Sequence, residues 1–333
     1  MMDIKDIGKL IKGSPQDIVI LSHRNPDGDA LGSSMALKLY LEKYRHTVKI
    51  VFPSEMPTGF EFINNIQDII VFDNSRDVAL EAIRKAGLLF CVDFNSLERI
   101  DKMGETFQNN QSPKVVIDHH LDPEPFANFY ISDTTASSTS ELVYHLIESL
   151  NDKDLITEDM GTAIFLGIIT DTGSFKYNTR PETYEIAAKL KRIGIDDNKL
   201  QNNIYNNLNE KNLRLLGHCL ANRMELLAGG KAAMIYLNKD DYQRFQIGRG
   251  DTEGIINYLL MIKSVQLAVF VMEQPTVIKL SLRSKGDVSV QAMASSHFNG
   301  GGHKNASGGY AYAKLDDILE KVRRVVPHYL VFD

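Results

Sequence analysis

Residues 18–30, Ile-Val-Ile-Leu-Ser-His-Arg-Asn-Pro-Asp-Gly-Asp-Ala, decide how the first half of the chain is interpreted. The apolar run Ile18 to Leu21 predicts a buried strand, and apolar residues at helical spacing predict a helix over Ala30 to Tyr44. A strand, a polar turn and a helix in this order predict the start of a βαβ unit. Ligands of open parallel sheets bind at the carboxyl ends of the strands, which is where this turn lies.

Short apolar runs continue to alternate with helical patterns up to about residue 190, which is typical of a parallel sheet flanked by helices. The further predicted strands are Val48 to Phe52, Ile69 to Phe72, Leu88 to Val92 and Val115 to Ile117. The further predicted helices are Ser138 to Leu150, Met160 to Ile169 and Glu182 to Ile193. The fold class is therefore α/β, with a parallel sheet in the first part of the chain.

The chain has 333 residues, about twice the usual domain length, so two domains are expected. The polar stretch Gln201 to Lys211 predicts a connector. Beyond it lie predicted strands and helices of a smaller α/β domain: strands Ala232 to Leu237, Val265 to Met272 and Val277 to Leu282, with a hairpin at Gln274-Pro275, and helices Val288 to His297 and Leu315 to Val326. We expect one domain over 1–190, a helical linker over 191–212 and a second domain over 213–333.

Charge is unevenly divided between the two halves of the chain. Residues 1–190 carry 18 Lys and Arg against 29 Asp and Glu, whereas residues 191–333 carry 19 against 14. An acidic half can hold metal ions and a basic half can hold anions, although scattered surface charge is the simpler alternative.

Only two cysteines are present, which excludes a disulfide framework and a cysteine-based zinc site. An acidic N-terminus without a long apolar stretch predicts a cytoplasmic protein.

Titratable side chains follow several of the predicted strands and helices. They are His23, Asp27 and Asp29 in the first turn, Asp93 after a strand, Asp118, His119 and His120 after another, and Asp171 after a helix. For each aspartate taken singly, capping of a helix or loop is the structural alternative. Carboxylates with a few imidazoles suit Mn²⁺, Mg²⁺ or another divalent ion. Their number suits two ions that share a carboxylate, which can activate water for displacement at phosphorus in a phosphoester or phosphoanhydride.

The second predicted domain contains a glycine-rich stretch, Asn299 to Gly309, with the sequence NGGGHKNASGG. Backbone N–H groups of such a stretch can approach an anion closely, and His303, Lys304 and Ser307 add donors. Arg283, at the end of a predicted strand, can aim a guanidinium at the same anion. We therefore predict an anion-binding glycine loop, the alternative being a flexible loop without a ligand.

These motifs, taken in order, resemble the DHH phosphoesterase superfamily, which is named after the triplet Asp118-His119-His120. The resemblance covers nearly the whole chain, and GGGHKNASGG resembles the DHH-associated C-terminal domain. It implies a metal-binding catalytic domain over 1–190 and a substrate-binding domain over 213–333. By length and domain pairing the chain resembles the NrnA-type branch of bifunctional oligoribonucleases (nanoRNases) and 3′-phosphoadenosine 5′-phosphate (pAp) phosphatases. The resemblance implies a cytoplasmic manganese hydrolase of short RNA or nucleotide bisphosphates, with a homodimer as a family-level expectation.

The resemblance also implies a role for each candidate residue. One ion would be held by His23, Asp27 and Asp93, and the other by Asp29, Asp93, His119 and Asp171, with Asp93 bridging them. Of the implied catalytic residues, Asp118 would orient the imidazoles and His120 would face the scissile phosphate or the leaving oxygen. From across the domain cleft, the substrate's terminal phosphate would be held by Arg283, Gly301, Gly302, His303 and Ser307. The two ions would be Mn²⁺, with Mg²⁺ or Co²⁺ as substitutes.

Four other functions are alternatives. A linear or cyclic dinucleotide phosphodiesterase uses the same catalytic motifs and is the first of these. A family II pyrophosphatase is disfavoured by the glycine motif, and a RecJ-like exonuclease by the absence of an aromatic, basic platform for a long strand. A nucleotide sensor without activity is disfavoured by the intact set of ligands.

Overall fold

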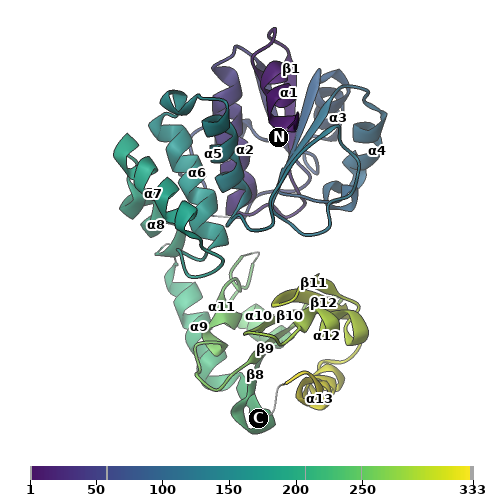
Figure 1. Ribbon diagram of the computed structural model, residues 1–333. Helices are drawn as coiled ribbons and strands as arrows, with labels where there is room; N and C mark the ends of the chain where they lie inside the picture. The colour runs from purple at the N-terminus through teal and green to yellow at the C-terminus, as the bar shows by residue number, and fades with distance from the viewer. Residues whose placement is uncertain (1, 58, 207, 249, 331–333) are drawn as a thin grey trace. The chain divides into compact units, whose positions relative to one another are not determined.

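The computed structural model describes residues 2–57, 59–206, 208–248 and 250–330. The chain divides into two units, Met1–Asn207 and Leu208–Asp333 (Figure 1). The division falls inside the polar stretch Gln201 to Lys211, whereas the domain limits and the linker over 191–212 remain predictions. Each unit contains its own six-stranded sheet and its own hydrophobic core, so each is described by itself.

Unit 1 is built on a six-stranded sheet in the order β3-β2-β1-β4-β5-β6, in which all neighbours are parallel. The strands are β1 (Asp17–Leu21), β2 (Thr47–Phe52), β3 (Ile70–Val71), β4 (Leu88–Val92), β5 (Lys114–Asp118) and β6 (Phe129–Ser132). The predicted parallel sheet is confirmed, and β6 is an additional, half-buried edge strand. The strand order reverses between β1 and β4, so their carboxyl ends form the crevice in which open α/β sheets bind ligands.

Helices cover both faces of this sheet. They are α1 (Met2–Ile11), α2 (Gly28–Glu42), α3 (Arg76–Lys85), α4 (Gly104–Asn109), α5 (Thr139–Ser149), α6 (Glu158–Asp171), α7 (Pro181–Ile193) and α8 (Asp197–Tyr205). Figure 1 shows α1, α2, α5 and α6 on one face and α3 and α4 on the other, which matches the two apolar clusters of this unit. In the described part of the chain, no helix has the length and apolar character needed to cross a membrane.

The expected connector Gln201 to Lys211 is helical in its first half. Helix α8 extends to Tyr205; its Leu200 is buried in the core of unit 1, and Ile204, one turn further on, packs against that core. Two apolar residues in an otherwise polar segment are too weak a pattern to locate the helix from the sequence, because periodicity needs several apolar residues on one face.

Helices α2 and α6 pack unusually closely, and glycine makes this possible. A Cβ atom on Gly32 of α2 would lie 2.4 Å from the carbonyl oxygen of Ala163 and 2.8 Å from the backbone nitrogen of Gly167, both on α6. The two backbones therefore touch where a side chain would keep them apart. This close contact brings the first turn of α2, with Asp29, to the last turn of α6, with Asp171.

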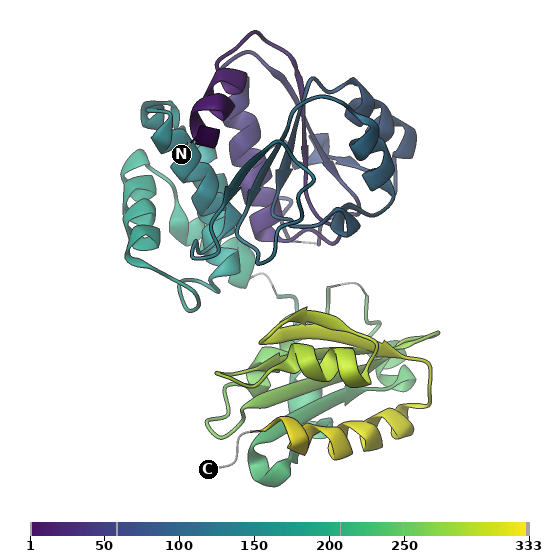
Figure 2. The ribbon, with the colours of Figure 1, turned by 45° about the vertical axis from the view of Figure 1, so that its right-hand side comes forward.

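Unit 2 has a mixed sheet in the order β11-β12-β10-β9-β8-β7, in which only β8 and β9 pair in parallel. Its strands are β7 (Met224–Leu227), β8 (Ala232–Leu237), β9 (Leu267–Glu273), β10 (Ile278–Ser284), β11 (Gly301–His303) and β12 (Ala306–Ala311). Its helices are α9 (Glu210–Asn222), α10 (Lys239–Arg244), α11 (Ile255–Leu259), α12 (Val290–His297) and α13 (Leu315–Val325). Helices α12 and α13 cover one face (Figure 2), and the antiparallel β9–β10 pair confirms the predicted hairpin at Gln274-Pro275.

The glycine-rich stretch Asn299 to Gly309 is mostly strand, which corrects the prediction of a glycine loop. Strands β11 and β12 form a short antiparallel ladder within it. A Cβ atom on Gly300 would lie 1.9 Å from the carbonyl oxygen of Gly308, so this approach of two backbones requires glycine. The many glycines of this stretch are therefore explained in part by close packing within the hairpin, and not only by a need to leave room for a ligand.

We predict that Gly32→Ala destabilises unit 1 by about 1–3 kcal/mol, because α6 must move away from the new methyl group. Alanine favours a helix over glycine by about 1 kcal/mol, so helix propensity alone would make this variant more stable. A loss of stability would therefore come from the packing of α2 against α6. Gly104→Ala is the matched control, since its Cβ atom would meet its nearest neighbour at 3.7 Å. Urea unfolding followed by circular dichroism measures both variants, and equal midpoints would contradict the close packing.

Candidate metal centre

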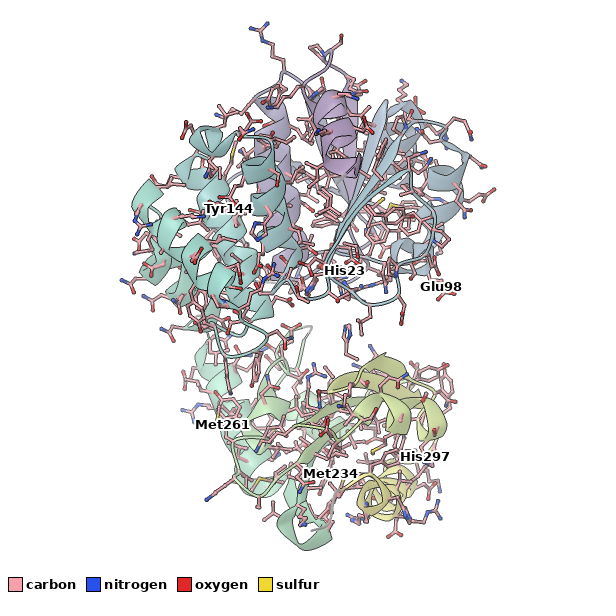
Figure 3. All side chains as sticks on the ribbon, in the orientation of Figure 1. His23, Glu98, Tyr144, Met234, Met261 and His297 are labelled. Carbon is pink, nitrogen blue, oxygen red and sulfur yellow. The ribbon has the colours of Figure 1, made fainter. Side chains whose placement is uncertain are left out.

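The predicted metal ligands converge at the carboxyl edge of the unit 1 sheet. His23 follows β1, and Asp93 follows the neighbouring β4 at the point where the strand order reverses. Figure 3 shows His23 at the ends of these strands. Ligand atoms lie within 4.8 Å of one another in three groups: His23, Asp27 and Asp93; Asp29, His119 and Asp171; and Asp93, His119 and His120. All six residues predicted as ligands are therefore brought together.

Asp93 stands between the groups, with one carboxylate oxygen facing each side. Its Oδ2 lies 3.3 Å from His23 Nε2, and its Oδ1 lies 3.9 Å from His119 Nε2. The residue is buried and has a left-handed backbone, with φ of 63°. A non-glycine residue in that conformation at a strand end is strained, and such strain is concentrated at functional sites. This geometry suits a carboxylate that is shared by two ions.

Two histidines present their Nε2 atoms to the centre because their Nδ1 atoms are otherwise engaged. His23 Nδ1 lies 2.9 Å from the carbonyl oxygen of Arg24, and His119 Nδ1 lies 3.2 Å from that of Ala136. A carbonyl oxygen can only accept, so each Nδ1 carries the proton. In the neutral ring the lone pair is then on Nε2, which is the atom that would ligate a metal.

Asp27 and Asp29 use the helix termini in different ways. Asp27 is the N-cap of α2 and accepts hydrogen bonds from the backbone N–H groups of Asp29 and Ala30, so the capping alternative is correct for this residue. The same carboxylate lies 4.0 Å from His23 Nε2. Asp29 is buried, and its two oxygens accept hydrogen bonds from the N–H groups of Thr139 (2.6 Å) and Ser140 (2.9 Å), at the N-terminus of α5.

Asp118 and His120 form a pair beside the ligands. Asp118 is fully buried, and its Oδ1 lies 2.7 Å from His120 Nδ1. The Nε2 atom of His120 lies 3.1 Å from a guanidinium nitrogen of Arg99, a half-buried residue that the sequence analysis did not identify. Arg99 lies in a short 3-10 helix after β4, Leu97–Met103, and belongs to no predicted motif, so it gave no signal.

The carboxylates of this centre have strongly displaced pKa values. Burial and the nearby Asp93 and Asp171 carboxylates raise the pKa of Asp29 well above its usual value. Burial raises the pKa of Asp171 to about 7; the charge of His119 opposes this shift, and Asp93 and Asp27 add to it. Burial alone would raise the pKa of Asp93, but its hydrogen bond with His23 and the charges of the histidines hold that pKa below its usual range.

The histidine pKa values are displaced in the same electrostatic field. Burial disfavours the charged form of His23, but its hydrogen bond with Asp93 and the charge of that carboxylate raise its pKa above the usual value. Burial likewise disfavours charged His120, and the hydrogen bond with Asp118 raises its pKa.

The donor set fits hard divalent cations. Each group offers carboxylate oxygens and imidazole nitrogens, which suit Mn²⁺, Mg²⁺ and similar ions. Burial, and after it repulsion from neighbouring carboxylates, raises the pKa values of Asp29 and Asp171, and a divalent cation relieves that repulsion.

The predicted substrate residues lie on three neighbouring strands of unit 2. Arg283 on β10 and His303 on β11 are both paired with Ala306 of β12, so the two side chains share one face of the sheet. Arg283 is half-buried, and desolvation lowers its pKa. The next row contains Ser307, Leu282 and Gly302 and faces the other way. Ser307 is buried, and its hydroxyl donates to the carbonyl of His303 at 2.9 Å.

The structure thus places Arg283 and His303 on one face of the sheet, on strands separated by β12, and Ser307 on the other face. Gly301 and Gly302 lie on the exposed β11, and a Cβ atom on Gly301 would have no neighbour within 4 Å. Packing therefore does not require glycine at position 301, and a close-fitting ligand would explain it. Ser307 contributes to the shape of the hairpin through its bond to His303.

Comparisons with known proteins cover both units. Residues 17–168 match the DHH family, N-terminal domain, and residues 229–327 match the DHHA1 domain. The bifunctional oligoribonuclease and PAP phosphatase NrnA of Bacillus subtilis is 28% identical over 91% of this chain and 92% of its own length. An exopolyphosphatase-related protein from Bacteroides fragilis is 36% identical, with a TM-score of 0.96 over 98% of this chain and 96% of its own. The cyclic-di-AMP phosphodiesterase PdeA of Listeria monocytogenes is 27% identical over 89% of this chain but 44% of its own length.

We predict that metal affinity rises with pH through about 7. A carboxylate must lose its proton to bind a cation, so below the pKa of Asp171 protons compete with the metal. The raised pKa of His23 acts in the same direction. Between pH 6 and pH 8 the Mn²⁺ affinity should increase about tenfold for one such proton.

Calorimetric titration with Mn²⁺ in two buffers of different ionisation enthalpy counts the protons released at each pH. Asp171→Asn should bind more weakly and lose part of the pH dependence. Binding to the wild-type protein without proton release at pH 6 would contradict the assignment of Asp171 as a ligand.

Proposed function

The chain belongs to the DHH family of phosphoesterases, and from this premise we propose that it is a manganese-dependent hydrolase of very short oligoribonucleotides, of pAp, or of both. The products would be mononucleotides from RNA, and AMP with phosphate from pAp. The observation that carries the proposal is Asp93, whose two oxygens face two separate ligand groups. We keep a cytoplasmic location and a homodimer as predictions.

The proposed metal ligands divide into two sets around Asp93. His23 and Asp27 complete one set, and Asp29, His119 and Asp171 complete the other. Two divalent ions bound there would supply an activated water and neutralise charge for in-line displacement at phosphorus. The chain's own contribution is to hold the carboxylates close and the imidazole Nε2 atoms free.

His120 is the proposed proton donor to the leaving oxygen. Asp118 holds the ring through Nδ1, which leaves Nε2 as the nitrogen that can donate, and the raised pKa of His120 favours the protonated form. In the structure this Nε2 lies 3.1 Å from the Arg99 guanidinium, whose charge opposes protonation of His120, so an entering phosphate would have to accept from both groups. A phosphate that enters there meets both an acid and a cation, which is the environment that a developing negative charge requires.

The substrate class is inferred from the pairing of both units with NrnA relatives. The B. subtilis relative, named for oligoribonuclease and PAP phosphatase activity, aligns over nearly its full length. A second phosphate at one end of a short substrate is the group that Arg283 and His303 would bind. Burial alone lowers the pKa of Arg283, which means that its charge is partly desolvated. An anion bound beside this guanidinium would compensate for the lost solvation.

A linear or cyclic dinucleotide phosphodiesterase is the second candidate. It is favoured by the match to PdeA, which is named a cyclic-di-AMP phosphodiesterase. This chain spans less than half of PdeA, so the remaining length of that protein has no counterpart in the alignment. The two candidates share the metal chemistry and differ in the substrate that the second unit accepts.

We predict that Asp93→Ala and His119→Ala abolish turnover while the protein still folds, because each removes a ligand from the shared centre. Asp68→Ala, an exposed change in the same unit, is the control for loss of one carboxylate. Release of phosphate or mononucleotides is measured with Mn²⁺, and circular dichroism checks the fold. Activity retained in both variants would refute the two-metal centre.

The substrate is identified by a time course of the purified protein with Mn²⁺. The panel is pAp, pApA, cyclic di-AMP, RNA of two to five nucleotides, RNA of twenty-four nucleotides, pyrophosphate and polyphosphate. We expect pAp or the shortest RNAs to be hydrolysed fastest. Preference for cyclic di-AMP or pApA would select the second candidate, and preference for long RNA, pyrophosphate or polyphosphate would overturn both.

We predict that Arg283→Gln raises KM for pAp with a smaller effect on kcat, because the residue binds a phosphate remote from the bond that breaks. A lost charge-assisted hydrogen bond of about 1.5–3 kcal/mol corresponds to a KM increase of roughly tenfold to a hundredfold. Arg324→Gln on α13 is the control, since that exposed residue lies on a helix that covers the opposite face of the sheet. Equal KM values for the two variants would exclude Arg283 from substrate binding.

A further inference from the structure

One short segment of unit 1, residues 136–140, contacts three of the proposed metal ligands. It connects β6 to the first turn of α5. Thr139 and Ser140 donate their backbone N–H groups to Asp29, as described above. The hydroxyl of Thr139 also lies 3.1 Å from Asp93 Oδ1. The carbonyl of Ala136 accepts from His119 Nδ1. The position of this segment therefore sets the orientation of all three ligands.

The segment is fixed from behind by a fully buried carboxylate, Glu141. Its Oε2 lies 2.5 Å from the hydroxyl of Ser137 and 2.8 Å from that of Thr183 on α7. Its Oε1 accepts two hydrogen bonds from the guanidinium of Arg180, from Nε at 2.7 Å and from the terminal nitrogen at 2.6 Å. Burial opposes its ionisation, but hydrogen bonds with His145, Ser137 and Thr183 lower the pKa of Glu141 to about 2.

Arg180 also reaches the beginning of the same loop. Its other terminal nitrogen lies 2.8 Å from the Thr135 hydroxyl and 3.3 Å from Asp133 Oδ2. Asp133 in turn accepts from the N–H and the hydroxyl of Thr135. A single guanidinium thus holds both ends of the loop, at residues 133–135 and at Glu141.

We propose that Glu141 and Arg180 are positioning residues for the metal centre, which hold residues 136–140 against Asp29, Asp93 and His119. Neither side chain contacts the metal or the substrate in this scheme. The proposal rests on the metal centre proposed above. It adds that the affinity of this centre for metal depends on an ion pair that lies outside it.

The chemistry of glutamate at position 141 cannot be reproduced by glutamine. The side-chain oxygens of Glu141 only accept hydrogen bonds, and every neighbour described above is a donor. In Glu141→Gln one of the two oxygens becomes an NH₂ group, which faces a donor, and Arg180 loses the nearer of its two carboxylate partners and keeps only Asp133. The loop then loses its anchor although size and helix propensity are almost unchanged.

The chain offers a matched control between the same two helices. Glu148 of α5 pairs with Lys189 of α7 at 3.2 Å, near the other end of α5. Glu148→Gln breaks an ion pair between α5 and α7 with the same change of atoms but does not touch residues 136–140. Any general effect of weakening this helix contact appears in both variants.

The test is Mn²⁺ binding by calorimetry and by electron paramagnetic resonance of the free ion, on the full chain, for the wild type, Glu141→Gln and Glu148→Gln. We expect Glu141→Gln to weaken binding by about 10-fold to 100-fold, as for other residues that orient metal ligands. Glu148→Gln should bind like the wild type. Activity of Glu141→Gln should recover toward the wild-type value as Mn²⁺ is raised, because the ligands themselves are intact.

Equal Mn²⁺ affinity of the two glutamine variants would overturn this proposal and leave the metal centre standing. Absence of Mn²⁺ binding by the wild type would reject the metal centre itself, and the proposal with it. If Glu141→Gln does not fold, Arg180→Lys carries the test, since it keeps the charge but loses the paired hydrogen bonds to Glu141. Unchanged affinity in Arg180→Lys would then be the contrary result.

Discussion

Mutual repulsion among buried carboxylates is the constraint around which unit 1 is arranged. Asp29 and Asp93 are buried, Asp171 lies beside them, and burial and proximity raise the pKa values of the first and the third. Such a cluster disperses unless the backbone holds it. Three features do so: the reversal of strand order that places β1 beside β4, the close contact of α2 with α6, and the N-terminus of α5 against Asp29. Each of them opposes the same electrostatic force.

Much of this arrangement is predictable from the sequence, because it depends on local patterns that end in titratable residues. Apolar runs that end in His23, Asp93 or Asp118 indicate buried strands, and parallel strands bring their carboxyl ends to one edge. The order of such motifs then resembles a known family, and the matches to both family domains confirm that resemblance. Asp27 shows that one residue can satisfy two interpretations, since it is both a helix cap and part of a ligand group.

The features that could not be predicted depend on tertiary contacts with no local pattern. Arg99 lies in a short 3-10 helix without a predicted motif, and only the folded chain places its guanidinium beside His120. Glu141 and Arg180 are 39 residues apart; Glu141 belongs to α5 and Arg180 precedes α7. In unit 2, the alternation of side chains along a strand turns Ser307 away from Arg283 and His303, although all three are donors of the kind that an anion needs. A glycine-rich composition did not distinguish a loop from a tightly packed hairpin.

The division of the chain at residue 207 places every proposed metal ligand in one unit and the proposed phosphate anchor in the other. If the proposed roles hold, chemistry and choice of substrate are encoded in separate stretches of sequence. Substitutions in the β11–β12 hairpin can accumulate without disturbing the packing of α2 on α6 or the tautomers of the histidines. A family built in this way can diversify its substrates by drift in one half of the gene while purifying selection preserves the other.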